Sequence, residues 1–189
     1  DDPVWVPTVF TKNRDRLLKA EVARKFLAEL LTHKKVRALL SDEHFSVDGT
    51  LLEAWASSKS FRPKDGSGSP ADPGRNGEQD FRGQKRSNET HASTTDPDAR
   101  LYRKGNTGAQ LSYQGHVLME HRSGLVRAAC VSRATGYGER ESALSLLQRL
   151  PGRRRRTLAA DKAYDTADFV AACRNAGVTP HVAQHNHAR

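Results

Sequence analysis

A polar tract in the middle of the chain sets the strongest limit on how it can fold. Residues 57–100 contain only five apolar residues among 44, and 16 of the 44 are Gly, Pro or Ser. Such a tract buries too little apolar surface to offset the conformational entropy lost on ordering it. We therefore expect a long mobile loop at 57–100, poorly packed apart from local structure near Phe61 and Phe81, with the folded core built from the residues on either side.

The residues before the tract predict a helical segment followed by one strand. An apolar residue recurs every four positions, at Leu18, Val22, Phe26 and Leu30. This spacing predicts one helical face over residues 16–39, within a helical N-terminal segment at 1–40. Residues 45–50 then alternate between apolar and polar side chains, which predicts a half-buried strand with Asp48 on its polar face.

The residues after the tract predict strands and helices in alternation. Apolar side chains at odd positions over 111–119, a turn at 122–124 and an apolar run over 125–132 predict a hairpin. Helical patterns follow at 139–150 and from Asp165 to Gly177, with short apolar strands at 158–161 and 178–182. The sequence therefore predicts an α/β fold with a mixed sheet flanked by helices, forming one domain at 41–189.

Positive charge is concentrated in the last half of the chain. The formal net charge is +9, and residues 101–189 carry 14 basic against 6 acidic side chains. This excess favours a polyanionic partner, and nucleic acid is the natural one because no basic amphipathic helix with an aromatic face is present. Arg153, Arg154, Arg155 and Arg156 form a dense basic run that is a candidate phosphate contact, or alternatively a solvated loop.

The sequence also limits the compartment. No apolar run approaches the roughly 20 residues of a membrane span, so no membrane partner is expected. Two cysteines cannot build a disulfide scaffold, which favours the reducing cytoplasm.

Two aspartates are the main candidates for chemistry. Asp48 lies on the polar face of its strand, and Asp161 ends a later apolar strand, where side chains of α/β proteins converge on ligands. Two neighbouring carboxylates repel each other unless a cation neutralises them, and Mg²⁺ prefers such oxygen ligands. Alternatively, each aspartate only caps a local turn. Lys162, next to Asp161, either meets a phosphate or pairs with an acid.

Four strings of the sequence carry a resemblance to a known family. They are His44–Ala56, Ser60–Gly66, Thr95–Lys104 and Ala160–Asp165. Together they resemble bacterial insertion-sequence transposases of the DDE class, in the IS-five-like group. The resemblance implies an RNase H-like catalytic core behind an N-terminal helical region, with the first two catalytic acids and metal ligands at Asp48 and Asp161.

The resemblance also implies an activity and its partners. The enzyme would use two Mg²⁺ or Mn²⁺ ions to cleave and join phosphodiesters of double-stranded DNA, at transposon ends and target. A homo-oligomer and a nucleoid-associated, cytoplasmic location are further expectations.

Two departures from the family pattern bear on activity. Position 163 is Ala where many relatives carry Gly, a change that a loop tolerates. The third acid of the family is a Glu on a helix beyond the last strand, and these 189 residues do not include that helix. Glu139 and Glu141 precede the Asp161 strand and are not expected to replace it. We therefore expect a truncated piece of a longer protein that is inactive alone.

Two other functions remain open from the sequence. One is a non-catalytic nucleic-acid-binding module whose carboxylates are structural. The other is an RNase H-like nuclease that cuts without joining strands.

Overall fold

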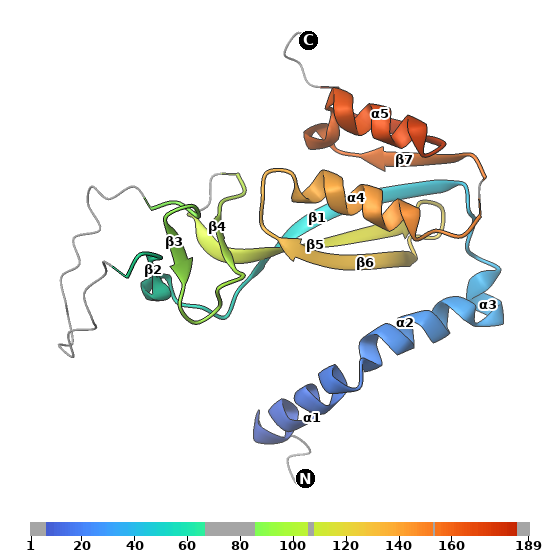
Figure 1. Cartoon of the computed structure of the whole chain (residues 1–189). Coiled ribbons are helices and arrows are strands. Elements are labelled where there is room, and N and C mark those ends of the chain that lie inside the picture. The colour runs from blue at the N-terminus through green and yellow to red at the C-terminus, as the bar shows by residue number, and fades with distance from the viewer. Residues whose placement is uncertain (1–6, 67–85, 106–107, 153, 185–189) are drawn as a thin grey trace. The chain divides into compact units, whose positions relative to one another are not determined.

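The computed structural model describes residues 7–66, 86–105, 108–152 and 154–184 (Figure 1). The chain divides into two compact units, residues 1–41 and 42–189, and each is described by itself. No helix in these described ranges is long and apolar enough to cross a membrane.

The first unit consists of three helices in place of the single helix expected over 16–39. They are α1 (Pro7–Lys19), α2 (Val22–Thr32) and the short α3 (Lys34–Arg37). Glu21 adopts a left-handed conformation with φ of 52°, and this residue separates α1 from α2. His33 leaves the helical region and separates α2 from α3. The prediction of one helix was therefore wrong. The apolar residues keep their four-residue spacing across Glu21, so the spacing does not show where one helix ends and the next begins.

The second unit is built on a mixed six-stranded sheet (Figure 1). The strands are β1 (His44–Glu53), β4 (Arg100–Tyr102), β5 (Gln110–Glu120), β6 (Val126–Arg133), β7 (Arg156–Ala160) and β8 (Val178–Val182). β5 pairs antiparallel with β1 on one edge and with β4 and β6 on the other. β7 runs parallel to both β1 and β8. The predicted α/β class with a mixed sheet and flanking helices is confirmed.

Two helices of this unit enclose its main core. α4 (Gly138–Gln148) follows β6, and α5 (Ala167–Asn175) follows β7. Their apolar side chains, including Leu146 and Phe169, join Phe45 and Leu158 of the sheet in one buried cluster. The hydroxyl of Thr166 caps α5 by accepting a hydrogen bond from the Phe169 amide at 3.3 Å.

The buried face of β5 is more polar than its sequence pattern indicated. The alternation at 111–119 placed apolar side chains at odd positions, yet Tyr113, Val117 and Met119 are only partly buried. The fully buried face carries Ser112, Gln114, His116, Leu118 and Glu120. Gln114 and His116 are buried against the start of α4, which an alternation of residue types cannot reveal.

Part of the polar tract is ordered. It contains a 3₁₀ turn η1 (Ser58–Ser60) and the paired strands β2 (Phe61–Pro63) and β3 (His91–Ser93). Phe61 stacks on His91 with ring centroids 5.4 Å apart, and Ser60 and Ser93 share a buried hydrogen bond of 2.8 Å. The local structure expected near Phe61 is therefore present, whereas the order over 86–100, where polar hydrogen bonds supplement a small apolar core, was not expected. Residues 67–85, with Phe81, lie outside the described residues.

Candidate functional site

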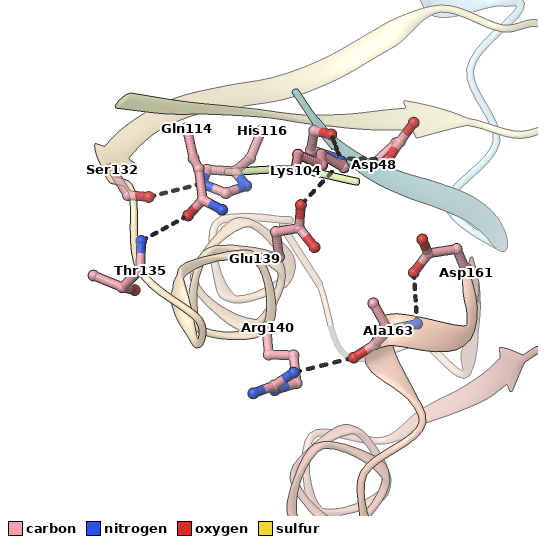
Figure 2. Close-up of polar contacts among 11 residues, drawn as sticks. Asp48, Lys104, Gln114, His116, Ser132, Thr135, Glu139, Arg140, Asp161 and Ala163 are labelled. Atoms are coloured by element: carbon pink, nitrogen blue, oxygen red, sulfur yellow. Dashed lines mark hydrogen bonds and ion pairs between the residues drawn. The ribbon is translucent and has the colours of Figure 1, made fainter. Parts of the chain in front are cut away.

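The two candidate aspartates lie at the same level of the sheet on neighbouring strands. Ser46 of β1 is in register with Ala159 of β7, and Asp48 and Asp161 each follow two residues later. The backbone at Asp161 is still extended, so it continues the direction of β7 and faces the same side of the sheet as Asp48. Both residues are exposed. The parallel pairing of β1 with β7 has ended at this point, so the two carboxylates stand where the strands separate (Figure 2).

Each aspartate also makes one local hydrogen bond. Oδ1 of Asp48 accepts from the amide of Gly49 at 2.7 Å, and Oδ1 of Asp161 accepts from the amide of Ala163 at 2.9 Å. The second bond caps the 3₁₀ turn η2 (Lys162–Tyr164). The local capping anticipated from the sequence is therefore present, and it engages one oxygen of each carboxylate.

A third carboxylate comes from α4. A Cβ atom at Gly49 would lie 2.9 Å from Oε1 of Glu139, so this side chain rests on the buried face of β1 at Gly49. Lys104 Nζ donates to the Gly49 carbonyl at 2.7 Å and pairs with Oε1 of Glu139 at 3.2 Å (Figure 2). Only 20% of the Glu139 side chain is exposed. The lysine therefore ties the helix start to the strand that carries Asp48.

The hydroxyl of Tyr164 is buried in the main core of this unit. The residue is 1% exposed, and its hydroxyl has no hydrogen-bond partner among the described residues. Burial raises the pKa of Tyr164 first, and the negative charges of Glu139, Asp161 and Asp48 raise it further. The charges of three carboxylates from three elements thus act on this one buried phenol.

A polar layer lies beneath the first turn of α4. His116 Nε2 is 2.8 Å from the hydroxyl of Ser132, while its Nδ1 is buried without a partner among the described residues. Burial lowers the pKa of His116. Oε1 of Gln114 accepts a hydrogen bond from the amide of Thr135 at 3.3 Å. These groups support the turn from which Glu139 extends.

The candidate DNA-binding residues differ in their exposure to solvent. Arg154, Arg155 and Lys162 are exposed, whereas Arg153 lies outside the described residues. Arg156 is only 7% exposed, and its guanidinium donates to the carbonyls of Pro151 and Gly152. The expectation that all four arginines face a DNA backbone is corrected at Arg156, which braces the loop before β7.

The donor chemistry of the site fits a hard divalent cation such as Mg²⁺. Asp48 and Asp161 offer carboxylate oxygens at one level, and Mg²⁺ commonly takes one or two carboxylates with water completing its shell. Nowhere in the described ranges do three or more His, Cys, Asp or Glu side chains gather closely enough to hold an ion together. The fit therefore rests on two direct carboxylates.

The comparisons with known proteins leave the family open. No protein-family model matches the chain, and no curated protein matches it significantly.

Sequence reasoning missed Lys104 and Tyr164, and it considered Glu139 only to set it aside as a ligand. Glu139 had the ordinary position of an acid in the first turn of a helix, where it favours the helix dipole. The only signal for Tyr164 was its place three residues after Asp161, and no pattern singled out Lys104.

Proposed function

We propose that this chain carries the catalytic core of a DNA transposase of the DDE class, with an RNase H-like arrangement of strands. The observation that carries the proposal is the placement of Asp48 and Asp161 at one level of two adjacent parallel strands, both exposed. This is the pair of residues that the sequence resemblance identified as the first two catalytic acids.

The strand arrangement supports the same proposal. On one side of β1, the strands β5 and β6 continue the sheet with antiparallel pairing. On the other side, β7 and β8 continue it with parallel pairing. Such a sheet, with crossover helices between β6, β7 and β8, is compatible with the fold that the resemblance implies. Ligands of mixed α/β sheets gather where parallel strands end, as the two aspartates do.

Mg²⁺ or Mn²⁺ is the proposed cofactor, held by Asp48 and Asp161. A bound divalent ion would activate the attacking oxygen and neutralise charge developing on the phosphate. The protein contributes the orientation of the carboxylates, since the Gly49 and Ala163 amides each donate a hydrogen bond to one Asp oxygen.

Double-stranded DNA is the proposed partner. Residues 101–189 carry a net charge of +8, and Lys162, Arg154 and Arg155 are exposed on the same unit as the aspartates. Such charges neutralise phosphates and release counterions, which makes binding strongly salt-dependent. We place a homo-oligomer and a nucleoid-associated location in the same proposal.

We propose that DNA binding and catalysis are separable in these 189 residues, because the resemblance places the family's third acid on a further helix. We propose that the 189-residue chain binds DNA but does not cleave or join it alone, because catalytic groups that act as a unit lose most of their effect when one is missing. An extended chain that includes the Glu-bearing helix would cleave and join in Mg²⁺ or Mn²⁺.

The test is a cleavage and strand-transfer assay on transposon-end DNA, with both chains side by side and Asp48→Asn as the inactive control. Cleavage and joining by the extended chain, lost in Asp48→Asn, is the expected result. Cleavage without joined product would identify a nuclease instead. No metal-dependent activity in the extended chain would overturn the proposal.

A non-catalytic nucleic-acid-binding module is the second candidate. It is favoured by one observation, that each aspartate already makes a local hydrogen bond with a backbone amide. Such a module would bind DNA equally well in EDTA and after Asp48→Asn, and neither form would cleave.

A further inference from the structure

Trp55 has the most exposed large apolar side chain among the described residues. It is 90% exposed, whereas Leu52 at the end of the same strand is 41% exposed. Tryptophan is ordinarily well buried in a folded protein, because its indole carries one of the largest apolar surfaces of any side chain. The exposure of Trp55 leaves its indole open to a partner.

A tight turn holds Trp55 outside the fold. The Ala56 amide donates to the Ala54 carbonyl at 2.7 Å, which is the hydrogen bond of a three-residue γ-turn centred on Trp55. The Ala54 amide donates to the Leu111 carbonyl of β5 at 2.8 Å, and Ala54 is 8% exposed in the small core that it shares with Leu111. Ala56 packs against the same core. Both neighbours of Trp55 are therefore anchored, and the indole extends from an ordered turn.

The chain that follows this turn is basic and polar. Between Glu53 and Asp65 it carries Lys59, Arg62 and Lys64 and no acidic side chain. Both lysines are exposed, and so are the two serines that precede the first of them. The core of a protein–protein interface is instead apolar and depleted of lysine. An indole beside positive charges and hydroxyls complements a polyanion that also has aromatic faces, and a nucleic acid has both features.

An indole can stack only on a base whose face is exposed. In a paired duplex each base is covered by its neighbours, and side chains reach only the base edges in the grooves. Unpaired bases present their faces, and aromatic side chains commonly hold them by stacking. The exposed indole therefore selects DNA that contains an unpaired base.

We propose that Trp55 is a stacking platform for an unpaired DNA base, with Lys59 contacting a neighbouring phosphate. This inference rests on the proposed function, since it takes DNA as the partner. β1 continues for five residues beyond Asp48, to Glu53, which corresponds to roughly 17 Å of strand. The stacked base is therefore about five nucleotides away from a phosphate held at Asp48. Trp55 contributes to DNA binding and is not a catalytic residue.

The experiment measures the binding of the 189-residue chain to three dye-labelled DNA hairpins by fluorescence anisotropy. The hairpins are identical except at one position, which holds an unpaired thymine, an unpaired abasic residue or no extra residue. The variants are Trp55→Ala, the conservative Trp55→Phe and the matched control Tyr137→Ala. Tyr137 is another exposed aromatic residue, and the Arg140 guanidinium lies over its ring at 5.5 Å.

Two further measurements make the comparison secure. Trp55 loses little packing when it is replaced, so urea unfolding of Trp55→Ala should have an unchanged midpoint. The chain has two tryptophans, so a Trp5→Phe background leaves Trp55 as the single indole. In that background we expect the thymine hairpin to quench the indole fluorescence and the abasic hairpin to leave it unchanged.

We expect Trp55→Ala to weaken binding of the thymine hairpin by roughly 5- to 150-fold, and binding of the other two hairpins by less than about twofold. Trp55→Phe should retain most of the affinity, and Tyr137→Ala should leave the affinity for all three hairpins unchanged.

Three other outcomes would overturn the inference. Equal weakening of all three hairpins by Trp55→Ala, or no weakening, would refute stacking while leaving DNA binding intact. A dimer that forms with rising protein concentration in sedimentation, and that Trp55→Ala abolishes, would identify a second copy of the chain as the occupant. If the unchanged chain binds none of the hairpins, the proposed DNA partner itself fails, and the stacking platform fails with it.

Discussion

Replacing Gly138 with alanine tests how tightly the start of α4 is fitted to the sheet. A Cβ at this position would lie 2.4 Å from Oε1 of Gln114, and 3.2 Å from the hydroxyl oxygens of both Ser132 and Thr135. Gln114 is 2% exposed and already accepts the Thr135 amide, so its side chain cannot retreat without losing that bond. The added methyl group would therefore enter a closed space that is lined by the polar side chains of Gln114, Ser132 and Thr135.

The expected cost combines two effects. Overpacking a filled site typically costs about 1–3 kcal/mol, and a buried amide group displaced from its partner costs a comparable amount. Alanine favours the helix over glycine by about 1 kcal/mol in a helix interior, and by less at a first position. We expect Gly138→Ala to lower the free energy of unfolding by roughly 1–3 kcal/mol.

The assay is urea unfolding followed by circular dichroism, with Gly136→Ala as the matched control. A Cβ at Gly136 would meet nothing within 4 Å, so this variant should be neutral or slightly stabilising. A double-mutant cycle with Gln114→Ala should recover part of the loss, by roughly 1 kcal/mol, because the closest opposing atom is removed. Equal stability of the two alanine variants would refute the closed packing around Gly138, and with it the fixed position of the turn that carries Glu139.

Three further predictions follow from charge and burial. Replacing Arg154 and Arg155 with Ala should reduce the slope of log binding constant against log salt by about two units, and an unchanged slope in filter binding would show that neither meets a phosphate. The pKa of His116 is lowered in the folded state, so its contribution to stability is complete above pH 6.5 and is lost as the pH falls toward the folded pKa. In urea unfolding at several pH values, His116→Gln should remove this loss of stability, and an unaltered pH profile would contradict the prediction. Burial raises the pKa of Cys173 to about 11, so at neutral pH a thiol reagent should label the half-buried Cys130 first, and early labelling of Cys173 by mass spectrometry would count against the core packing.

The α/β class could be predicted because periodic patterns mark separate elements. The strand around Asp48, the hairpin after residue 110 and the short strand before Asp161 all formed near the expected bounds. The break at Glu21 could not be predicted, since a left-handed residue in the middle of an apolar stripe leaves the spacing unchanged. The order of the polar tract over 86–100 was missed for a different reason. Its small core draws Ala54 and Leu111 from outside the tract, so the composition of the tract underestimated what it could bury.

The same distinction between local sequence patterns and contacts distant in sequence applies to the candidate site. Asp48 and Asp161 were recognisable because each stands at a definite place in its own strand. The position of Glu139 depends on three separate facts, which are the pairing of β1 with β5, the packing of α4 over that pair and the missing side chain at Gly49. None of the three is encoded near residue 139. An acid in a first helical turn has the same local sequence whether it faces water, as Glu141 does, or a strand, as Glu139 does. Only the fold separates these two cases.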